Sequence, residues 1–525
     1  MISRVYSAAI AGLDAQKVTV EVDLASGIPG VFIVGLPDAA VNESKERVKS
    51  AIKNSEFAFP LKRVVINLAP ADIKKEGTVF DLPLAVGVLL ASEALMPTEF
   101  LEKTCFAGEV SLEGSLRPIA GTLSMALMAR EEGMEYLVVP EENMLEASLV
   151  EGITVFGLKH LKDLPVFLVH PHTFSKPVDR QTLMAKAKSR VSPYGVDFAD
   201  VKGHAHAKRA LEIAASGGHN VVMVGPPGSG KSMLAKAFVG ILPGLSFDEM
   251  LEVSRIYSVA GMLSQQEGLI FHRPFRSPHH SASAPGIAGG GSNPKPGEMT
   301  LAHRGVLFLD EFVEFSRNAL EVLRQPLENG EVTISRAQQN VTYPAKFMLM
   351  AALNPCPCGF KGDNVKTCTC SDTQVQRYIS KISGPLLDRI DIQLEIPRLT
   401  DKELLEKPGA EGETSETIRA RVEAAREIQK RRFESTGVLC NAEMTPGQIQ
   451  EFCVLDDGSK ELMQRAAQRM HLSARAFDRI LRLARTLADL ESVEAVASTH
   501  LAEALQYRAL ERLYQPRGNA AAALV

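Results

Sequence analysis

Hydrophobic and polar residues alternate near the start of the chain. Between positions 17 and 24 every second residue is apolar, namely Val18, Val20, Val22 and Leu24. Strict alternation places the apolar side chains on one face and predicts a half-buried strand. The following segment, GIPGVFIVGLPD, predicts a turn, a strand and a second turn, after which Asp38 is suited to cap a helix that runs to about Asn54.

The same patterns divide the chain into parts. Apolar strands at 63–68, 105–112 and 136–139, with helical stretches between them, predict an α/β domain over residues 1–165. Residues 166–195 gain Pro, Ser and Lys and predict a linker. A second α/β unit is expected over 196–398 and a helical region over 399–525. The helices expected there are 416–433, 460–470, 473–490 and 498–514.

The segment HNVVMVGPPGSGKSMLAKAF carries a phosphate-binding motif. The apolar strand Val221–Val224 precedes GxxxxGKS, and a helical pattern follows. Glycines let backbone N–H groups converge on phosphates at the helix start, while Lys231 is suited to reach the β- and γ-phosphates and Ser232 to contact Mg²⁺. A purely structural glycine turn is the alternative, and the flanking strand and helix argue against it. The predicted ATP-binding residues are Gly225, Pro226, Pro227, Gly228, Ser229, Gly230, Lys231 and Ser232.

Two further strands end in polar residues. VLFLDE has four apolar residues followed by Asp310 and Glu311, the pattern of a buried parallel strand. Asp310 is expected to hold Mg²⁺ and Glu311 to polarise the attacking water. An apolar strand at 347–353 ends at Asn354, whose amide is suited to contact the γ-phosphate or the water. An asparagine before proline is by itself typical of a turn, and its place after two nucleotide motifs favours the functional role.

Arginines follow in two places. SGPLLDRID places Arg389 beside carboxylates, where the sequence is consistent with a surface salt bridge or with an arginine finger that serves a neighbouring subunit's nucleotide. Further on, Ser473 is suited to cap a helix on which Arg475, Arg479 and Arg482 share a face. One of these three is expected to sense phosphate, with Arg475 the candidate, and the other two to be solvated charges.

Composition limits the possible functions. The chain has 525 residues, 45% of them apolar, which is enough for several folded domains. A net charge of −5 argues against binding of nucleic acid over the whole surface, and the absence of Trp argues against an aromatic stacking platform. No apolar run approaches the roughly 18 residues of a membrane-spanning helix. The expectation is a cytoplasmic protein with no membrane partner.

Four of the seven cysteines fall within a short segment. Two C-x-C pairs are separated by nine residues and consist of Cys356, Cys358, Cys368 and Cys370. Four thiolates suit a tetrahedral structural Zn²⁺ site. Free or redox-active thiols are the alternative, because the spacing is tighter than the usual C-x₂-C. The other three, Cys105, Cys440 and Cys453, are expected to be buried apolar residues.

These motifs resemble the magnesium-chelatase-like AAA+ ATPases, and specifically the ComM/YifB family. The resemblance is carried by DFADVKGHAHAKRALEIAASGGHN, FRSPHHSASAPGIAGGG, NPCPCG and SGPLLDRID, and it extends over essentially the whole chain. It implies a homohexameric ring in which the nucleotide-site residues act within one subunit, while Arg389 and Arg475 reach the adjacent site. It also implies a DNA motor linked to branch migration during natural transformation.

Two other segments resemble known elements. FAGEVSLEGSLRPIAG is similar to the proteolytic domain of Lon-type proteases, but the region EGTVFDLPLA has no serine and PIAGTLSMALMAR has no lysine. A Ser-Lys dyad is therefore missing. Residues 327–347 predict two strands around a turn, and the Gly-rich stretch before them, at 273–300, predicts an insert. In related replicative helicases a similar hairpin points a basic residue, here Arg336, into the ring pore. An exposed strand charge is the alternative, whereas six copies would form a basic collar that follows DNA phosphates.

The sequence therefore predicts an α/β protein with a Lon-protease-like N-terminal domain, an AAA+ core with a parallel sheet and a C-terminal helical lid. The favoured function is an ATP- and Mg²⁺-dependent hexameric motor on single-stranded or branched DNA, with a structural Zn²⁺. The alternative is a magnesium-chelatase-like ATPase subunit that remodels a protein partner. An ATP-dependent protease is disfavoured by the missing dyad.

Overall fold

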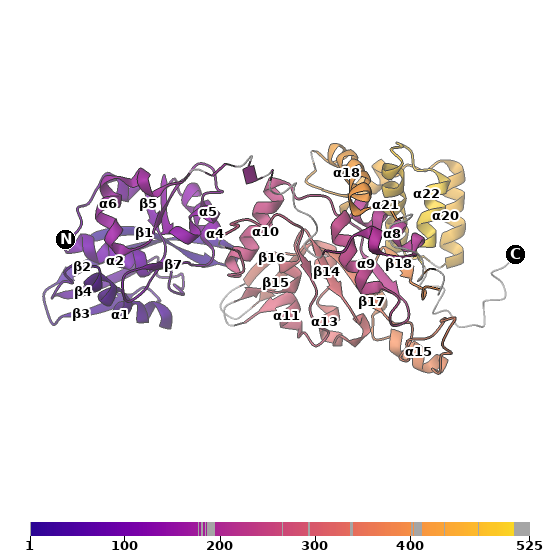
Figure 1. Cartoon of the computed structure of the whole chain (residues 1–525), viewed down its shortest axis with the longest axis horizontal. Helices are drawn as coiled ribbons and strands as arrows, with labels where there is room; N and C mark the ends of the chain where they lie inside the picture. The colour runs from indigo at the N-terminus through magenta and orange to yellow at the C-terminus, as the bar shows by residue number, and fades with distance from the viewer. Residues whose placement is uncertain are drawn as a thin grey trace. The chain divides into compact units, whose positions relative to one another are not determined.

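The chain forms two compact units, each described by itself. The structure, a computed structural model, describes residues 2–176, 178–179, 182–183, 185, 195–264, 266–291, 294–335, 340–400, 403, 412–434, 436–470 and 472–508 (Figure 1). The N-terminal unit comprises Met1–Ala187, Ser246–His272 and Ser335–Tyr343. The C-terminal unit comprises Lys188–Leu245, Arg273–Ile334 and Pro344–Val525.

A mixed seven-stranded sheet lies at the centre of the N-terminal unit, in the order β3-β4-β2-β1-β5-β8-β9. The predicted alternation is confirmed, because Val18, Val20 and Val22 are fully buried on one face of β2. β2 runs antiparallel to β1 and β4, and the other pairs are parallel. The strands are β1 (Ser3–Ala11), β2 (Asp14–Ala25), β3 (Gly30–Val34), β4 (Arg63–Ala69), β5 (Thr104–Phe106), β6 (Glu109–Val110), β7 (Leu116–Arg117), β8 (Tyr136–Pro140) and β9 (Thr154–Leu158).

One predicted strand of this unit is broken in two. The apolar run at 105–112 forms β5 and β6 rather than one strand. Between them, Gly108 donates its N–H to the Val79 carbonyl at 2.9 Å and accepts from the Leu82 N–H at 3.0 Å. The run therefore bonds to the start of a helix instead of continuing along the sheet.

Helices of the N-terminal unit pack on the central strands, with α2 and α4 against β1 and β2. Asp38 caps the first helix as predicted, accepting the Val41 N–H at 2.7 Å. The segment that begins at Ser246 was assigned from sequence to the second α/β unit, but it packs here: α10 lies against α4, and Arg255 Nε donates to the Leu13 carbonyl at 3.1 Å. The helices are α1 (Ala39–Asn54), α2 (Asp81–Ala91), α3 (Glu99–Glu102), α4 (Thr122–Glu131), α5 (Met144–Ala147), α6 (Leu164–Val169) and α10 (Phe247–Val259).

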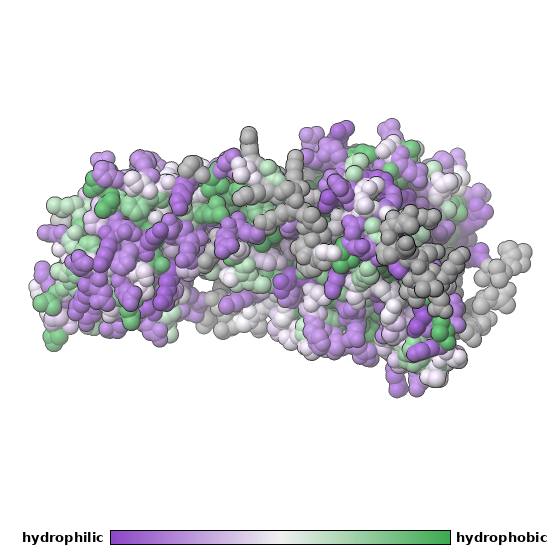
Figure 2. All heavy atoms as spheres, viewed as in Figure 1, coloured by the Kyte–Doolittle hydropathy of each residue, from purple (hydrophilic) through white to green (hydrophobic). Residues whose placement is uncertain are grey.

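The edge strand β3 exposes apolar side chains. Phe32 and Val34 are about half exposed, and Figure 2 shows hydrophobic groups in green at the end of the unit where Figure 1 labels β3. The guanidinium group of Arg63, on the neighbouring strand, lies 4.7 Å from the centre of the Phe32 ring. A charged side chain of this kind is a common protection of an edge strand against unwanted pairing.

A five-stranded parallel sheet forms the core of the C-terminal unit, in the order β11-β14-β17-β10-β18. The residues of β10 and β14 are buried, as expected for parallel strands covered on both faces. Because all five strands are parallel, the carboxyl ends of β14, β17 and β10 lie side by side at one edge. The strands of this sheet are β10 (Val221–Val224), β11 (Phe275–Arg276), β14 (Val306–Leu309), β17 (Met348–Leu353) and β18 (Ile392–Glu395). Outside it lie β12 (Gly289–Gly290), β13 (Lys295–Pro296), β15 (Glu331–Ser335) and β16 (Asn340–Pro344), and most of β16 belongs to the N-terminal unit.

The predicted C-terminal helices are present, drawn orange to yellow in Figure 1. Ser473 caps α21 as predicted, accepting the Ala476 N–H at 3.2 Å. The helix expected at 498–514 is described as α22 only to Gln506, and residues beyond 508 lie outside the described part. Among the described residues no helix combines the length and apolarity needed to cross a bilayer. The helices are α8 (Ala205–Gly217), α9 (Lys231–Phe238), α11 (Ala284–Ala288), α12 (Glu298–Leu301), α13 (Arg317–Glu321), α14 (Pro326–Asn329), α15 (Asp372–Ile379), α16 (Gly384–Leu387), α18 (Ser415–Arg432), α19 (Pro446–Phe452), α20 (Asp457–Met470), α21 (Ala474–Leu490) and α22 (Ser498–Gln506).

Candidate nucleotide site

The phosphate-binding loop joins β10 to α9, as the sequence predicts. Gly230 immediately precedes α9 in a left-handed conformation (φ 87°), which a side chain would strain. A methyl group at Gly225 would collide with the carbonyl oxygen of Ile396. The two glycines are therefore required by backbone geometry, and they leave the loop wrapped closely over the start of α9.

Lys231 lies inside this loop. It is 8% exposed, and its Nζ donates to the carbonyl oxygens of Gly225 at 2.7 Å and Pro226 at 2.9 Å. Burial lowers the pKa of Lys231 to about 8, although the nearby charge of Asp310 acts in the opposite direction. A buried ammonium group whose shortest hydrogen bonds go to backbone carbonyl oxygens is suited to an incoming anion such as a phosphate group.

The polar residues at the end of β14 face the start of α9. Ser232 Oγ donates to Asp310 Oδ2 at 2.7 Å, so the two predicted Mg²⁺ ligands are neighbours. Hydroxyl, carboxylate and phosphate oxygens are the ligands that Mg²⁺ prefers. Glu311 follows in a left-handed conformation (φ 51°), and its Oε2 lies 2.8 Å from Nδ1 of His280. His280 therefore holds the carboxylate that was predicted to polarise water, and sequence reasoning did not single it out.

Asn354 follows the last residue of β17. Its Oδ1 lies 3.5 Å from Nζ of Lys231. The three strand ends β14, β17 and β10 thus bring together five of the residues predicted for ATP hydrolysis: Lys231, Ser232, Asp310, Glu311 and Asn354.

The two candidate trans-acting arginines meet at one acidic residue. Arg389 follows α16 and Arg475 lies in the first turn of α21, and both donate to the carboxylate of Glu328 in α14. Hydrogen bonding from Arg389, together with the charges of both arginines, lowers the pKa of Glu328. Sequence reasoning did not single out Glu328, because nothing local marks it among the other acidic residues.

The other two arginines of α21 are not solvated charges, which corrects the prediction. Arg479 is mostly buried and donates to the Arg389 carbonyl at 2.7 Å and to Asp391 Oδ1 at 2.6 Å. Arg482 donates to the Met444 carbonyl at 2.6 Å, and burial lowers its pKa. The reason for the error is that these arginines bind partners that lie 38 or more positions away in the sequence.

Asp391 is expected to make stability depend on pH. Its side chain is 2% exposed; burial opposes ionisation, but the charge of Arg479, the His219 side chain and the Asn220 N–H outweigh it and hold the pKa of Asp391 below its ordinary value. A folded pKa below the unfolded one contributes stability above about pH 4 that is lost as the pH falls. Asp391→Asn should lower the free energy of unfolding at pH 7 by about 3 kcal/mol.

Denaturant unfolding of both proteins at pH 7 and near pH 3 measures this effect. The difference between parent and variant should shrink at the lower pH. Asp478→Asn, on α21 close to Arg479, is the matched control and should change stability little. An equal difference at both pH values would contradict the assignment.

Arg336 lies outside the described residues, as do residues 337–339 between β15 and β16. The two strands predicted around it are present and pair with each other. The first residues of the predicted tract instead form the end of α14. The position of Arg336 in a pore stays a prediction.

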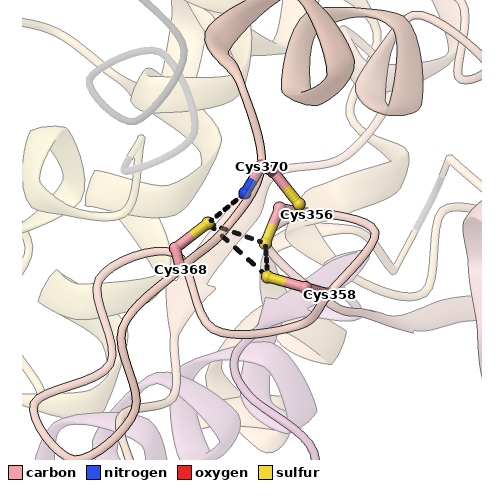
Figure 3. A group of neighbouring side chains, drawn as sticks. All are labelled: Cys356, Cys358, Cys368 and Cys370. Carbon is pink, nitrogen blue, oxygen red and sulfur yellow. Dashed lines mark hydrogen bonds between the residues drawn. The ribbon is translucent and has the colours of Figure 1, made fainter.

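The four clustered cysteines come together after β17. Their sulfur atoms lie within 4.8 Å of one another, and in Figure 3 those of Cys356, Cys358 and Cys368 face one another. Partial burial disfavours the thiolate of Cys358, but the backbone N–H groups of Phe360 and Thr369 and the thiols of Cys356 and Cys370 outweigh it and lower its pKa to about 6. Backbone N–H groups favour the thiolates of Cys368 and Cys370 as well, but burial and the neighbouring thiols outweigh them and raise the pKa of both. Thiolates at this separation are suited to a tetrahedral metal ion.

The loop of residues 356–370, which carries the four cysteines, packs against the phosphate-binding loop. Cys356 is two residues after Asn354 in the chain, and a methyl group at Gly359 would lie 2.7 Å from Cδ of Pro227. The remaining cysteines, Cys105, Cys440 and Cys453, are buried, as predicted.

A family model described as magnesium chelatase, subunit ChlI, matches residues 197–404. A model described as subunit ChlI of Mg-chelatase matches 20–143, and one described as the C-terminal part of magnesium chelatase subunit ChlI matches 412–508. Together with the parallel sheet and the site at its edge, these matches define a magnesium-chelatase-like AAA+ ATPase.

Two relatives are similar over nearly the whole chain. Competence protein ComM of Haemophilus influenzae is 42% identical over 520 residues, which cover 98% of this chain and 99% of that protein. The protein YifB of Salmonella typhimurium is 43% identical over 510 residues, 97% of each chain. The magnesium-chelatase 67 kDa subunit of Chlorobaculum parvum is 30% identical over 166 residues, 30% of this chain and 23% of that one. The chain belongs to the ComM/YifB family.

Proposed function

We propose that this protein is an ATP-hydrolysing motor that works on DNA as a homohexameric ring. The observation that carries the proposal is the set of groups at the edge of the parallel sheet, where Lys231, the Ser232–Asp310 pair and Glu311 surround one loop. Each has the chemistry needed to bind MgATP and activate water. Full-length similarity to a competence protein supports DNA as the substrate.

In this proposal each subunit contributes to two nucleotide sites. Residues 196–398, apart from 246–272 and 335–343, which belong to the N-terminal unit, form the ATPase core, and residues 399–525 form the helical lid, which carries Arg475. Arg389 and Arg475 act on the nucleotide of the adjacent subunit, where they stabilise charge on the transferred phosphoryl group. Arg336, on the hairpin between β15 and β16, contacts DNA phosphates in the pore without reading bases.

The remaining parts have supporting roles. Residues 1–165 form a Lon-protease-like domain without the catalytic dyad, joined through a linker at 166–195, and it serves assembly or DNA contact. The four clustered cysteines hold a structural Zn²⁺. The protein acts in the cytoplasm on single-stranded or branched DNA, during recombination or natural transformation.

DNA-stimulated ATP hydrolysis tests the proposal. Turnover is measured with single-stranded, duplex and branched DNA and without DNA, and it should rise with at least one of them. Arg336→Ala should abolish this stimulation while ATP binding is retained, because a phosphate contact adds affinity for any sequence. Unchanged stimulation in this variant would reject the pore assignment.

The second candidate function is an ATPase subunit that remodels a protein partner. Similarity to a magnesium-chelatase subunit favours it, because the matched family models bear that description. ATP hydrolysis that ignored all three DNA forms and rose with a protein partner would support it over the DNA motor.

A further inference from the structure

Glu328 joins the two arginines that we place at the neighbouring nucleotide. Its Oε2 accepts a hydrogen bond from Arg389 Nη2 at 2.5 Å, and its Oε1 accepts one from Arg475 Nη2 at 3.0 Å. Two guanidinium groups therefore converge on one anionic group. This is the arrangement in which arginines also bind a phosphate group.

The Arg389 side chain is buried where it pairs with Glu328. Its side chain is 6% exposed, and its Nη1 donates to the Pro385 carbonyl at 2.6 Å. Glu328 and Arg475 are 47% and 58% exposed, so an anion from outside the subunit can compete for them. Arg389, however, cannot bind a nucleotide of another subunit while Glu328 holds it.

Glu328 also lies close to the base of the β15–β16 hairpin. Gly330 ends α14 in a left-handed conformation and accepts the Ala345 N–H at 2.7 Å through its carbonyl oxygen. β15 begins at the next residue, Glu331. Glu328 is therefore two residues from the capping glycine and three residues from the first residue of β15.

We propose that Glu328 is an internal latch, whose carboxylate takes the place of a phosphate group between Arg389 and Arg475 in the separate subunit. In the ring, the triphosphate bound by the neighbouring subunit displaces this carboxylate and takes up both arginines. Displacement also removes the two ionic contacts that join α14 to Arg389 and to Arg475 of α21. This inference rests on the proposed function, because it assumes that Arg389 serves a neighbour.

The first test is ATP hydrolysis by a Glu328→Gln variant of the full chain. Glutamine keeps the shape of the side chain and removes the charge that competes with phosphate. DNA-independent turnover at low protein concentration should rise about threefold or more, as expected from removal of a partly exposed ion pair. The gain should vanish in the double variant E328Q/R389A. Glu321→Gln, which removes another Glu–Arg pair of the same unit at 2.8 Å, is the matched control.

The second test measures exposure of Arg389 without using activity. Phenylglyoxal labelling followed by mass spectrometry should show slow labelling of Arg389 and fast labelling of Arg475 in the parent. In E328Q the labelling of Arg389 should accelerate, and in E328D, with a shorter acid, it should be intermediate. Parental labelling of Arg389 in both variants, or turnover of E328Q at or below the parental rate, overturns the latch.

Mixing two variant subunits distinguishes a failure of the latch from a failure of the proposed function. R389A subunits mixed with K231A subunits should regain some hydrolysis, since each supplies what the other lacks at a shared site. If R389A alone hydrolyses ATP at the parental rate, both the role of Arg389 at the neighbouring subunit's nucleotide and the latch are rejected. If R389A is inactive and rescued, but E328Q is not activated, only the latch is rejected.

Discussion

A Glu311→Gln variant is expected to bind ATP as tightly as the parent and to hydrolyse it about a hundredfold more slowly, or slower still. Glutamine retains the size of the side chain but cannot take up a proton from water, and loss of a general base has this order of effect. Glu311 follows the strand that carries Asp310, and it is oriented by His280 at 2.8 Å. Because Lys231 and the Ser232–Asp310 pair are untouched, nucleotide affinity should not change.

Binding of a fluorescent ATP analogue measures nucleotide affinity, and the rate of phosphate release measures ATP hydrolysis. Glu314→Gln is the matched control, because Glu314 lies three positions further on, is similarly exposed and pairs with Lys381 at 3.5 Å. That variant should hydrolyse ATP like the parent. If E311Q kept more than about a tenth of parental turnover, another group would have to activate the water.

Loss of the zinc that we propose at the four-cysteine cluster is expected to have the second largest effect. Purified protein should carry about one zinc per chain, and Cys356→Ser should lose it and lower the melting temperature by about 5–10 °C. Four sulfur atoms within 4.8 Å gain strong bonds from a metal ion and little from one another. Since Gly359 of the same loop packs against Pro227, ATP affinity should fall in the same variant.

Metal content and melting temperature, measured before and after a chelator, decide this prediction. Cys453→Ala removes a buried thiol elsewhere, so it should lower stability modestly and leave the zinc content unchanged. Less than about half a zinc per chain in the parent, with no effect of the chelator, would favour free or redox-active thiols.

Local sequence patterns predicted much of this molecule. The alternation in β2, the caps Asp38 and Ser473, and the three strands that are followed directly by Gly225, Asp310 and Asn354 are all present. Each of these features is formed by residues within a few positions of one another, so the local sequence shows directly which residues interact. The parallel direction of the strands in this sheet also follows from the sequence, because buried apolar strands alternate with helices along the chain.

Other features depended on residues far apart in the sequence. Arg479 and Arg482 look like a solvated helix face until their acceptors at Asp391, Arg389 and Met444 are known. The sequence assigns helix α10 to the second α/β unit, and its contacts with α4 and Leu13 place it in the N-terminal one instead.

The resemblance to the family, the glycine-rich loop before α9 and the cluster of four cysteines are all evident in the sequence, because each is carried by continuous motifs. Which charged side chains meet becomes evident only once the chain is folded. Glu328 lies 61 positions from Arg389 and 147 from Arg475, and His280 lies far from Glu311 in the chain. An ion pair of this kind leaves no periodic pattern, since it needs a single carboxylate brought into place by packing.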